Sequence, residues 1–225
     1  MLIRKLSIFL TAAVLISCAS APKERFVNNG RPANLSGTLS EKAKNLYILA
    51  ENAGDKQKKA LLAKDGISFA EECIMKQPEN AACYYYRAMN TGVYYSAHIK
   101  GYQDGIKSMI KDCKKVITLD EKFDHAGAYR TLGKIYTDMP EIIITKKSVA
   151  KDTELAVKYL KTAVQLDPSY PENRIYLAYA LFEAGKKDEA LAELANAAGL
   201  VPMWTNHHDY AYWKKLNKDL ANKLK

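Results

Sequence analysis

The sequence lacks the motifs by which many enzyme active sites are recognised. It contains no GxSxG motif, no phosphate-binding glycine loop and no CxxC pair. Of its four histidines, His98 and His125 are isolated. The other two are consecutive and are followed by an aspartate, in His207-His208-Asp209. Metal-binding helices present histidines three or four residues apart, whereas consecutive helical side chains point in different directions. We therefore expect no enzyme activity, no cofactor and no metal site.

The sequence also lacks an apolar run long enough to span a membrane. Its N-terminal apolar segment, Leu6–Ile16, is well short of the about twenty residues that a spanning helix needs. Two cations, Arg4 and Lys5, precede this segment, and the small residue Ser17 follows it. Because that order is typical of a secretion signal, we predict a signal peptide at residues 1–17.

The end of this segment, Leu15-Ile16-Ser17-Cys18, resembles the bacterial lipobox. The resemblance implies that Cys18 carries a diacylglycerol and becomes the first residue of a lipoprotein; a chance cysteine after an ordinary signal is the alternative. Residues 18–39 then form the lipid anchor and a flexible tether, because they are rich in turn formers. Ser20 stands where aspartate would indicate inner-membrane retention, which favours the outer membrane, with the protein facing the periplasm.

Acidic residues are outnumbered by basic ones, and the formal net charge is +9. In a cytosolic protein this surplus would suggest a nucleic-acid partner. The predicted export argues against nucleic acid, and the basic residues are scattered as they are on solvated helix faces. Acidic lipid headgroups or an acidic protein face fit the charge better.

Cysteine is scarce, and once Cys18 carries lipid only Cys73, Cys83 and Cys113 remain. Three cysteines allow at most one internal disulfide in an oxidising periplasm. Cys73 and Cys83 flank Gln77–Asn80, a predicted turn between antiparallel helices, and are the favoured pair. The alternative is three buried thiols that pack as small apolar groups.

The clearest positive signal is an internal repeat. Four residues recur 34 positions later: Ala156, Leu160, Ala163 and Pro168 return as Ala190, Leu194, Ala197 and Pro202. This spacing is the tetratricopeptide period. The small residues let the second helix of each pair approach its neighbours closely, the leucines fill the space between helices, and the prolines set the turn into the next unit.

The first helix of each pair carries a matching pattern. Its core positions are occupied by Tyr129, Leu132, Gly133 and Tyr136 in one unit and by Leu177, Ala178 and Leu181 in the next. Arg174 stands where the later unit should have its aromatic residue. An insertion at Met139–Val149 separates the paired helices of the earlier unit, and its apolar run Ile142–Ile144 either covers the core edge or contacts a partner.

Apolar periodicity predicts further helices upstream and a capping helix at the end of the chain. The predicted segments are Ser40–Ala53 with Ser40 as N-cap, Gln57–Lys76, Ala81–His98, Gly101–Leu119, and Trp204–Leu224 with an interruption near Asn206–Asp209. Residues 40–225 are therefore expected to form one all-α domain. We predict a tetratricopeptide-like α-solenoid of about four helical pairs plus the C-terminal capping helix.

Over about residues 60–200 the sequence also resembles the T component of TRAP transporter systems, which are periplasmic tetratricopeptide-repeat lipoproteins. The lipobox, the mature length and Ala128–Gly133, followed by a proline-containing insertion, carry this resemblance. It implies a non-catalytic accessory of a TRAP-type solute uptake system that engages a periplasmic protein such as a solute-binding receptor, and a small apolar ligand. The alternatives are an adaptor or scaffold in an envelope assembly or secretion complex, and a carrier with a tyrosine-lined cavity. Homo-oligomerisation stays open.

Tetratricopeptide domains bind partners in a concave groove formed by their first helices. The positions expected to face this groove are Arg130 and Lys134, Ile175 and Tyr179, and, in the unit around Ala88, Tyr85 and Met89. Tyrosines beside two cations suit an extended acidic peptide or a carboxylate-bearing apolar ligand, unless the tyrosines pack against neighbouring helices. Replacing Arg130 and Lys134 together should then weaken partner binding with little change in melting temperature.

Overall fold

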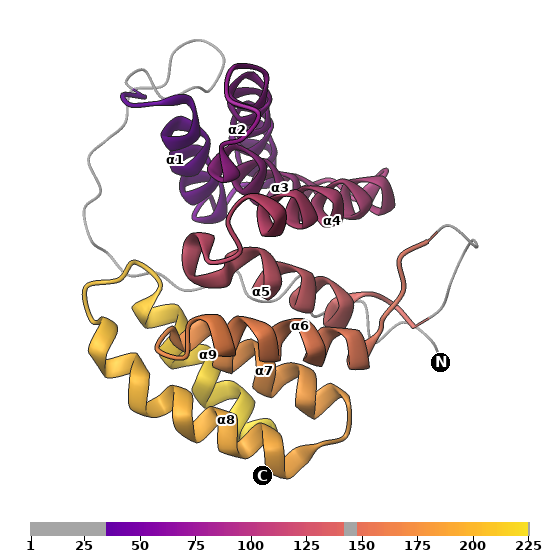
Figure 1. Ribbon diagram of the computed structural model, residues 1–225, viewed down its shortest axis with the longest axis vertical. Helices are drawn as coiled ribbons and strands as arrows, with labels where there is room; N and C mark the ends of the chain where they lie inside the picture. Colours follow the sequence, from indigo (N-terminus) through magenta and orange to yellow (C-terminus); the bar gives the residue numbers. More distant parts are fainter. Residues whose placement is uncertain (1–34, 142–147, 225) are drawn as a thin grey trace. The chain divides into compact units, whose positions relative to one another are not determined.

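The computed structural model describes residues 35–141 and 148–224 of the chain (Figure 1). Every regular element in these two ranges is a helix, which confirms the all-α prediction. The chain divides into two compact units, Met1–Leu119 and Asp120–Lys225, each of which is described by itself.

Some of the predictions concern residues outside the described ranges. They are the signal peptide, Cys18 and most of the tether, and the apolar run Ile142–Ile144. Among the helices that the structure describes, none combines the length and the apolar character needed to cross a bilayer.

Between residues 35 and 119, the described part of the first unit, there are four helices, close to the predicted positions: α1 (Leu39–Glu51), α2 (Lys56–Lys76), α3 (Ala81–Ala97) and α4 (Tyr102–Leu119). Neighbours along the chain pack together, and α1 also contacts α3 (Figure 1). The buried side chain of Asn90 in α3 donates a hydrogen bond to the Ala43 carbonyl of α1 at 2.9 Å. The Asn90 side chain has room because the residue of α2 next to it is Gly66, where an added Cβ would lie only 2.1 Å from the Asn90 amide oxygen.

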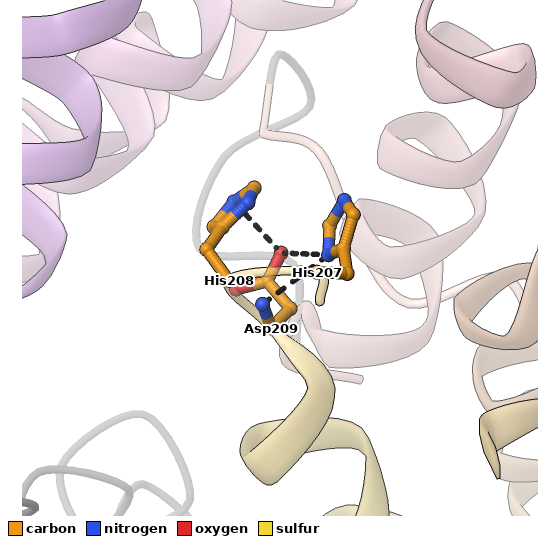
Figure 2. A group of neighbouring side chains, drawn as sticks. All are labelled: His207, His208 and Asp209. Carbon is orange, nitrogen blue, oxygen red and sulfur yellow. Dashed lines mark hydrogen bonds and ion pairs between the residues drawn. The ribbon is translucent and has the colours of Figure 1, made fainter. Parts of the chain in front are cut away.

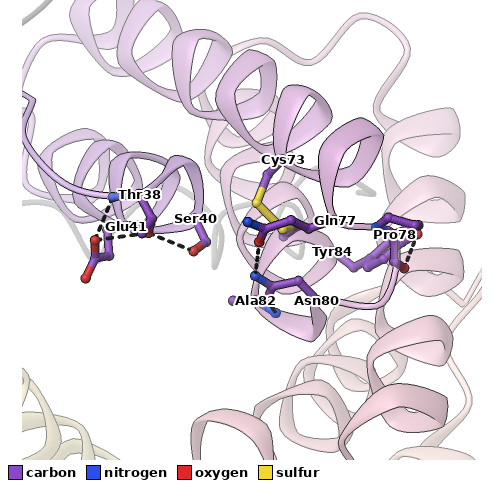
Figure 3. The surroundings of a disulfide bond; sticks show 10 residues. Thr38, Ser40, Glu41, Cys73, Gln77, Pro78, Asn80, Ala82 and Tyr84 are labelled. Atoms are coloured by element: carbon purple, nitrogen blue, oxygen red, sulfur yellow. Dashed lines mark hydrogen bonds between the residues drawn. A yellow bond between two sulfur atoms is a disulfide. The ribbon is translucent and has the colours of Figure 1, made fainter.

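The first helix begins at a capping box rather than at Ser40 (Figure 3). Thr38 is the N-cap: its hydroxyl accepts from the Glu41 N–H at 3.3 Å, and the Glu41 carboxylate accepts from the Thr38 N–H at 2.7 Å. The prediction of Ser40 as N-cap is therefore wrong. The reason is the spacing, because Glu41 stands three residues after Thr38 and completes the reciprocal pair.

A disulfide between Cys73 and Cys83 joins α2 to α3, with Cα atoms 5.6 Å apart, and confirms the favoured pairing (Figure 3). The turn between them is held by Asn80, whose side chain accepts from the Ala82 N–H at 3.0 Å and donates to the Gln77 side-chain oxygen at 2.7 Å. The remaining described cysteine, Cys113, is a free thiol buried in α4. Burial raises the pKa of this thiol, so it stays protonated and unreactive.

The second unit contains two helical pairs and a capping helix: α5 (Phe123–Asp138) with α6 (Thr153–Leu166), α7 (Pro171–Glu183) with α8 (Lys187–Leu200), the short 3-10 helix η2 (Val201–Trp204), and α9 (Tyr210–Lys223). The first helices α5 and α7 contact each other, and α9 packs against α7 and α8 (Figure 1). The capping helix therefore begins at Tyr210, after a turn that occupies the predicted interruption.

The repeat positions of the second unit form its core. Eleven of them are buried: Leu132, Gly133, Ala156, Leu160, Ala163, Leu177, Ala178, Leu181, Ala190, Leu194 and Ala197. The need for a small residue is clearest at Gly133, where an added Cβ would lie 2.3 Å from the Leu160 side chain of α6. Tyr129 and Tyr136 are half-buried, with Tyr159 between them at centroid distances of 6.2 and 6.0 Å. The prolines are the exception: Pro168 and Pro202 are exposed, which fits turn positions and not core positions.

Candidate functional site

Two of the predicted groove residues meet on the side of the second unit formed by α5 and α7. Lys134 of α5 donates from its ammonium to Asp138 Oδ2 at 2.6 Å. The Tyr179 hydroxyl of α7 is hydrogen-bonded to the same carboxylate. The Asp138 side chain is only 7% exposed, whereas that of Lys134 is 42% exposed. A buried acceptor thus ties together two side chains that reach solvent.

Further tyrosines surround this pair. The Lys134 ammonium lies 5.3 Å from the ring centre of Tyr176, a cation–π contact. Burial disfavours the Lys134 charge, but the Asp138 carboxylate outweighs burial, so the pKa of Lys134 is raised. Tyr212 of α9 lies within electrostatic range of the same ammonium. Burial also raises the pKa of Tyr179, and the carboxylates of Asp138 and Glu183 add to that effect. We call Lys134, Asp138, Tyr176, Tyr179 and Tyr212 the tyrosine face.

Arg130, the other predicted groove cation, lies in the interior and not on an open groove. Its guanidinium pairs with Glu172 at 2.9 Å and with Asp124 at 3.0 Å, and it donates to the Asn173 side chain at 3.0 Å. The Tyr170 ring centre is 4.8 Å away. The expectation that Arg130 faces a partner is therefore wrong: its charge is already compensated by two carboxylates, as a buried guanidinium requires.

The Arg130 network holds a strained turn at the start of α5. Asp124, His125 and Ala126 all have left-handed backbone conformations, with φ of 51°, 57° and 60°. Such a conformation costs non-glycine residues about 1–2 kcal/mol each. Arg130 donates to the carbonyls of Asp124 and His125 at 3.3 and 3.1 Å, and the Asn173 amide donates to the His125 carbonyl at 3.1 Å. These bonds offset the strain.

An aromatic cluster lies beside this network, formed by His125, Tyr170, Trp204, His207 and Trp213. The His125 ring is stacked on Tyr170 at 4.2 Å, and Tyr170 meets Trp204 and Trp213 edge-on at 5.3 and 5.1 Å. His207 is stacked on Trp213 at 4.5 Å. The cluster contains both tryptophans of the chain. It fixes η2 and the start of α9 against the first turn of α7.

The turn before α9 brings three potential ligand atoms together (Figure 2). One atom from each of His207, His208 and Asp209 lies within 4.8 Å of the other two. Asp209 Oδ2 is 3.1 Å from His208 Nε2 and 3.9 Å from His207 Nδ1. The prediction that these side chains point apart assumed a helix, whereas they lie in a turn and converge.

The first unit has its own concavity, a shallow cleft of about 300 Å³ between α2, α3 and α4. Its lining combines two tyrosines with an ammonium and a carboxylate: Lys64, Ile67, Thr91, Tyr94, Tyr95, Asp104, Gly105 and Ser108. The predicted groove residues of this unit, Tyr85 and Met89, are not among the residues that line it, and Tyr85 is buried. The later tyrosines of α3 thus face the cleft instead.

Ile175 is also buried, contrary to its predicted place in the groove. It packs in a core cluster with Tyr170, Ala197, Val201 and Trp213, because η2 and the capping helix cover that side of α7. The repeat pattern does not show how the capping helix packs against the repeats, so the sequence could not predict that this helix covers Ile175.

The residues that sequence reasoning missed are mainly the acidic partners. Asp138 stands four residues after Lys134, the spacing of a helical ion pair, and could have been found from that signal. Glu172 pairs with Arg130 from another helix, and Tyr212 belongs to α9. No local sequence pattern predicts the position of Glu172 or Tyr212, because each contact depends on how separate helices are aligned.

Comparison with known proteins agrees with the fold. Residues 150–208 match the family model of the tetratricopeptide repeat. The fold is similar to the crystal structure of a thermophilic TPR protein from Thermus thermophilus, with a TM-score of 0.53 and 20% identity over 76% of this chain and 80% of that one. No curated protein matches the chain. These matches confirm a tetratricopeptide-like fold and a tetratricopeptide repeat in the second unit.

Proposed function

We propose that this protein is a non-catalytic adaptor that binds an extended segment of a partner protein on the tyrosine face of its second unit. The observation that carries the proposal is that the Lys134–Asp138 pair, Tyr176 and Tyr179 of the first helices lie together, with Tyr212 of the capping helix α9 near the same ammonium. Tetratricopeptide folds in general serve protein–protein interaction on that side.

The chemistry of the face defines the partner. Tyrosines offer large, rigid surfaces with a hydroxyl at the edge, and lose little conformational entropy on binding. Because Asp138 already neutralises Lys134 and Arg130 is buried, the face does not select for an acidic peptide. A segment that presents apolar side chains and backbone amides suits it better, and this replaces the acidic peptide expected from the sequence.

Paired substitutions test the face, and circular dichroism checks that each variant is folded. Lys134→Gln with Tyr212→Ala removes the charge and one ring that is 40% exposed, while the glutamine amide can still donate to Asp138. Lys158→Gln with Leu191→Ala is the matched control, because these residues are exposed on the second helices α6 and α8. Full-length protein of each kind is used as bait in envelope extract. Proteins that wild type and control recover but the face variant does not would support the proposal; equal recovery by all three would refute it.

We further propose that the protein is a lipoprotein anchored through Cys18 at the periplasmic face of the outer membrane, and that it is an accessory of a TRAP-type solute uptake system. The lipobox-like Leu15–Cys18 and the resemblance of the chain to the T component support this. Mass spectrometry of the N-terminal peptide should find lipid on Cys18, and Cys18→Ala should release the protein from membranes. A solute receptor among the recovered partners favours the transport accessory, and assembly proteins alone favour the scaffold.

The cleft of the first unit is the place that we propose for a small apolar ligand. Its volume of about 300 Å³ is at the lower end of ligand pockets, and Tyr94 and Tyr95 supply aromatic surface. Native mass spectrometry of the purified full-length protein should show a bound small molecule that is lost from Tyr95→Ala. A wild-type spectrum with the mass of the protein alone would contradict a ligand role for the cleft.

A further inference from the structure

We propose that His207, His208 and Asp209 form a binding site for a divalent transition-metal ion of the zinc or copper type. The site lies in the turn between η2 and α9 (Figure 2). The inference is independent of the partner-binding proposal, since none of the three residues belongs to the tyrosine face.

The distances suit a shared ion. Zinc binds imidazole nitrogen and carboxylate oxygen at about 2.0–2.2 Å, which places neighbouring ligand atoms of a tetrahedral site about 3.3 Å apart. Asp209 Oδ2 lies 3.1 Å from His208 Nε2 and 3.9 Å from His207 Nδ1. The ligand atoms of His207 and His208 lie within 4.8 Å of each other, so side-chain rotation must bring them closer around the ion.

The Asp209 side chain faces the histidines and does not cap the helix that begins after it. It occupies the N-cap position of α9, where an aspartate side chain ordinarily accepts a hydrogen bond from the first turn, a contact that stabilises a helix by about 1 kcal/mol. Within the described chain, its side chain makes no such capping bond. Its carboxylate instead lies beside His208, and its backbone N–H donates to His207 Nδ1 at 3.2 Å. That lone pair of His207 therefore already points into the turn, where an ion would take the place of the N–H.

The turn is held in advance by the aromatic cluster. His207 is stacked on Trp213, and it lies edge-on to Tyr170 at 6.0 Å and to Trp204 at 5.7 Å. The His208 ring lies beside it at 4.3 Å. Because a metal site gains affinity when its ligands are already placed, this packing favours binding.

The donor set identifies the class of ion. Two imidazoles and one carboxylate suit zinc, copper or nickel, whereas magnesium and calcium prefer oxygen ligands alone. Three protein ligands leave a coordination position for water or for a side chain of a bound partner. The ion would link η2 to the start of the capping helix.

The test uses the two tryptophans of the chain, both of which belong to the aromatic cluster. Full-length, tag-free protein in detergent is treated with chelator and titrated with CuCl₂ while tryptophan fluorescence is followed, and with ZnCl₂ in a calorimeter. We expect quenching that saturates at one equivalent of copper, and one equivalent of zinc bound. MgCl₂ should have no effect on either signal.

Variants locate the ion. His208→Gln is chosen because His208 is exposed, and Asp209→Asn keeps the shape of the side chain; each should weaken copper and zinc binding by at least about tenfold. His98→Gln, which removes an exposed histidine of the first unit, should bind as wild type does. Circular dichroism in the absence of metal checks that each variant is folded. Affinities of His208→Gln and Asp209→Asn equal to wild type, or no quenching at all, would overturn the proposal.

Discussion

Arg130 and Glu172 form an ion pair of 2.9 Å between α5 and α7, with side chains only 6% and 12% exposed. The pair joins the first helices of successive repeats. Since the same guanidinium also bonds the carbonyls of the left-handed turn, Arg130 links the packing of the repeats to the conformation at the start of α5. Arg130 is therefore a stabilising residue, and the loss of its charge should lower the free energy of unfolding.

Arg130→Met should lower the free energy of unfolding by about 3–5 kcal/mol, because it leaves Glu172 buried without its cation. Burial already raises the pKa of Glu172 and Arg130 opposes that effect, so the variant should raise it further. Urea unfolding measures the change, and Lys158→Gln, which replaces an exposed residue of α6, is the control, with an expected loss below about 1 kcal/mol. Equal stability of Arg130→Met and wild type would contradict the role assigned to the pair.

The strain of the left-handed turn can be measured by comparing glycine substitutions at two buried alanines of α5. Ala126→Gly and Ala128→Gly both remove a buried methyl group and both add flexibility to the unfolded chain. Only Ala126 has a positive φ, so only there does glycine relieve strain. Ala128→Gly should therefore be the more destabilising of the two by about 1–2 kcal/mol in urea unfolding. Equal losses would mean that the turn is unstrained.

Asp167 gives the second unit an acid-sensitive contact. Burial raises the pKa of Asp167, but hydrogen bonds from Ser169 and from His125, which lies 2.7 Å away, outweigh burial and lower it. A carboxyl group whose pKa is lower in the folded state stabilises the fold above its unfolded value of about 3.9, and this stabilisation disappears as the pH falls through the folded value. Asp167→Asn should thus be less stable than wild type at pH 7, and the difference should vanish at a pH below the lowered pKa of Asp167. A gap that is the same at both pH values would argue against the contact.

The Cys73–Cys83 disulfide should stabilise the α2–α3 hairpin by restricting the unfolded chain. Reduction should lower the free energy of unfolding by about 2–4 kcal/mol. Cys113→Ser, which leaves the disulfide intact, should respond to reductant as wild type does, whereas Cys73→Ala should be unaffected by it. Identical unfolding curves of wild type with and without reductant would contradict a stabilising disulfide.

Much of the second unit could be predicted from its sequence because its signals are local. The 34-residue repeat places small residues such as Gly133 where helices cross, and the structure shows Leu160 in the space thus left. The burial of Arg130 depends on Glu172, 42 residues away, and no local pattern reveals it. The left-handed turn was equally hidden, because none of its three residues is glycine.

The tyrosine face was predicted only in part, for a related reason. Lys134 and Tyr179 follow from the repeat frame, whereas Ile175 was misplaced because the capping helix covers its side of α7. The convergence of His207, His208 and Asp209 also required knowledge of the backbone, since a turn and a helix direct consecutive side chains differently.

The most direct test of the central claim is the affinity of a recovered partner for the tyrosine face, measured by calorimetry with full-length wild type, Tyr212→Ala and Leu191→Ala. Tyr212 and Leu191 are similarly exposed, at 40% and 38%, on α9 and α8. If the face binds the partner, Tyr212→Ala weakens binding by about tenfold or more while Leu191→Ala leaves it unchanged. Equal affinities of all three proteins would show that the partner binds elsewhere.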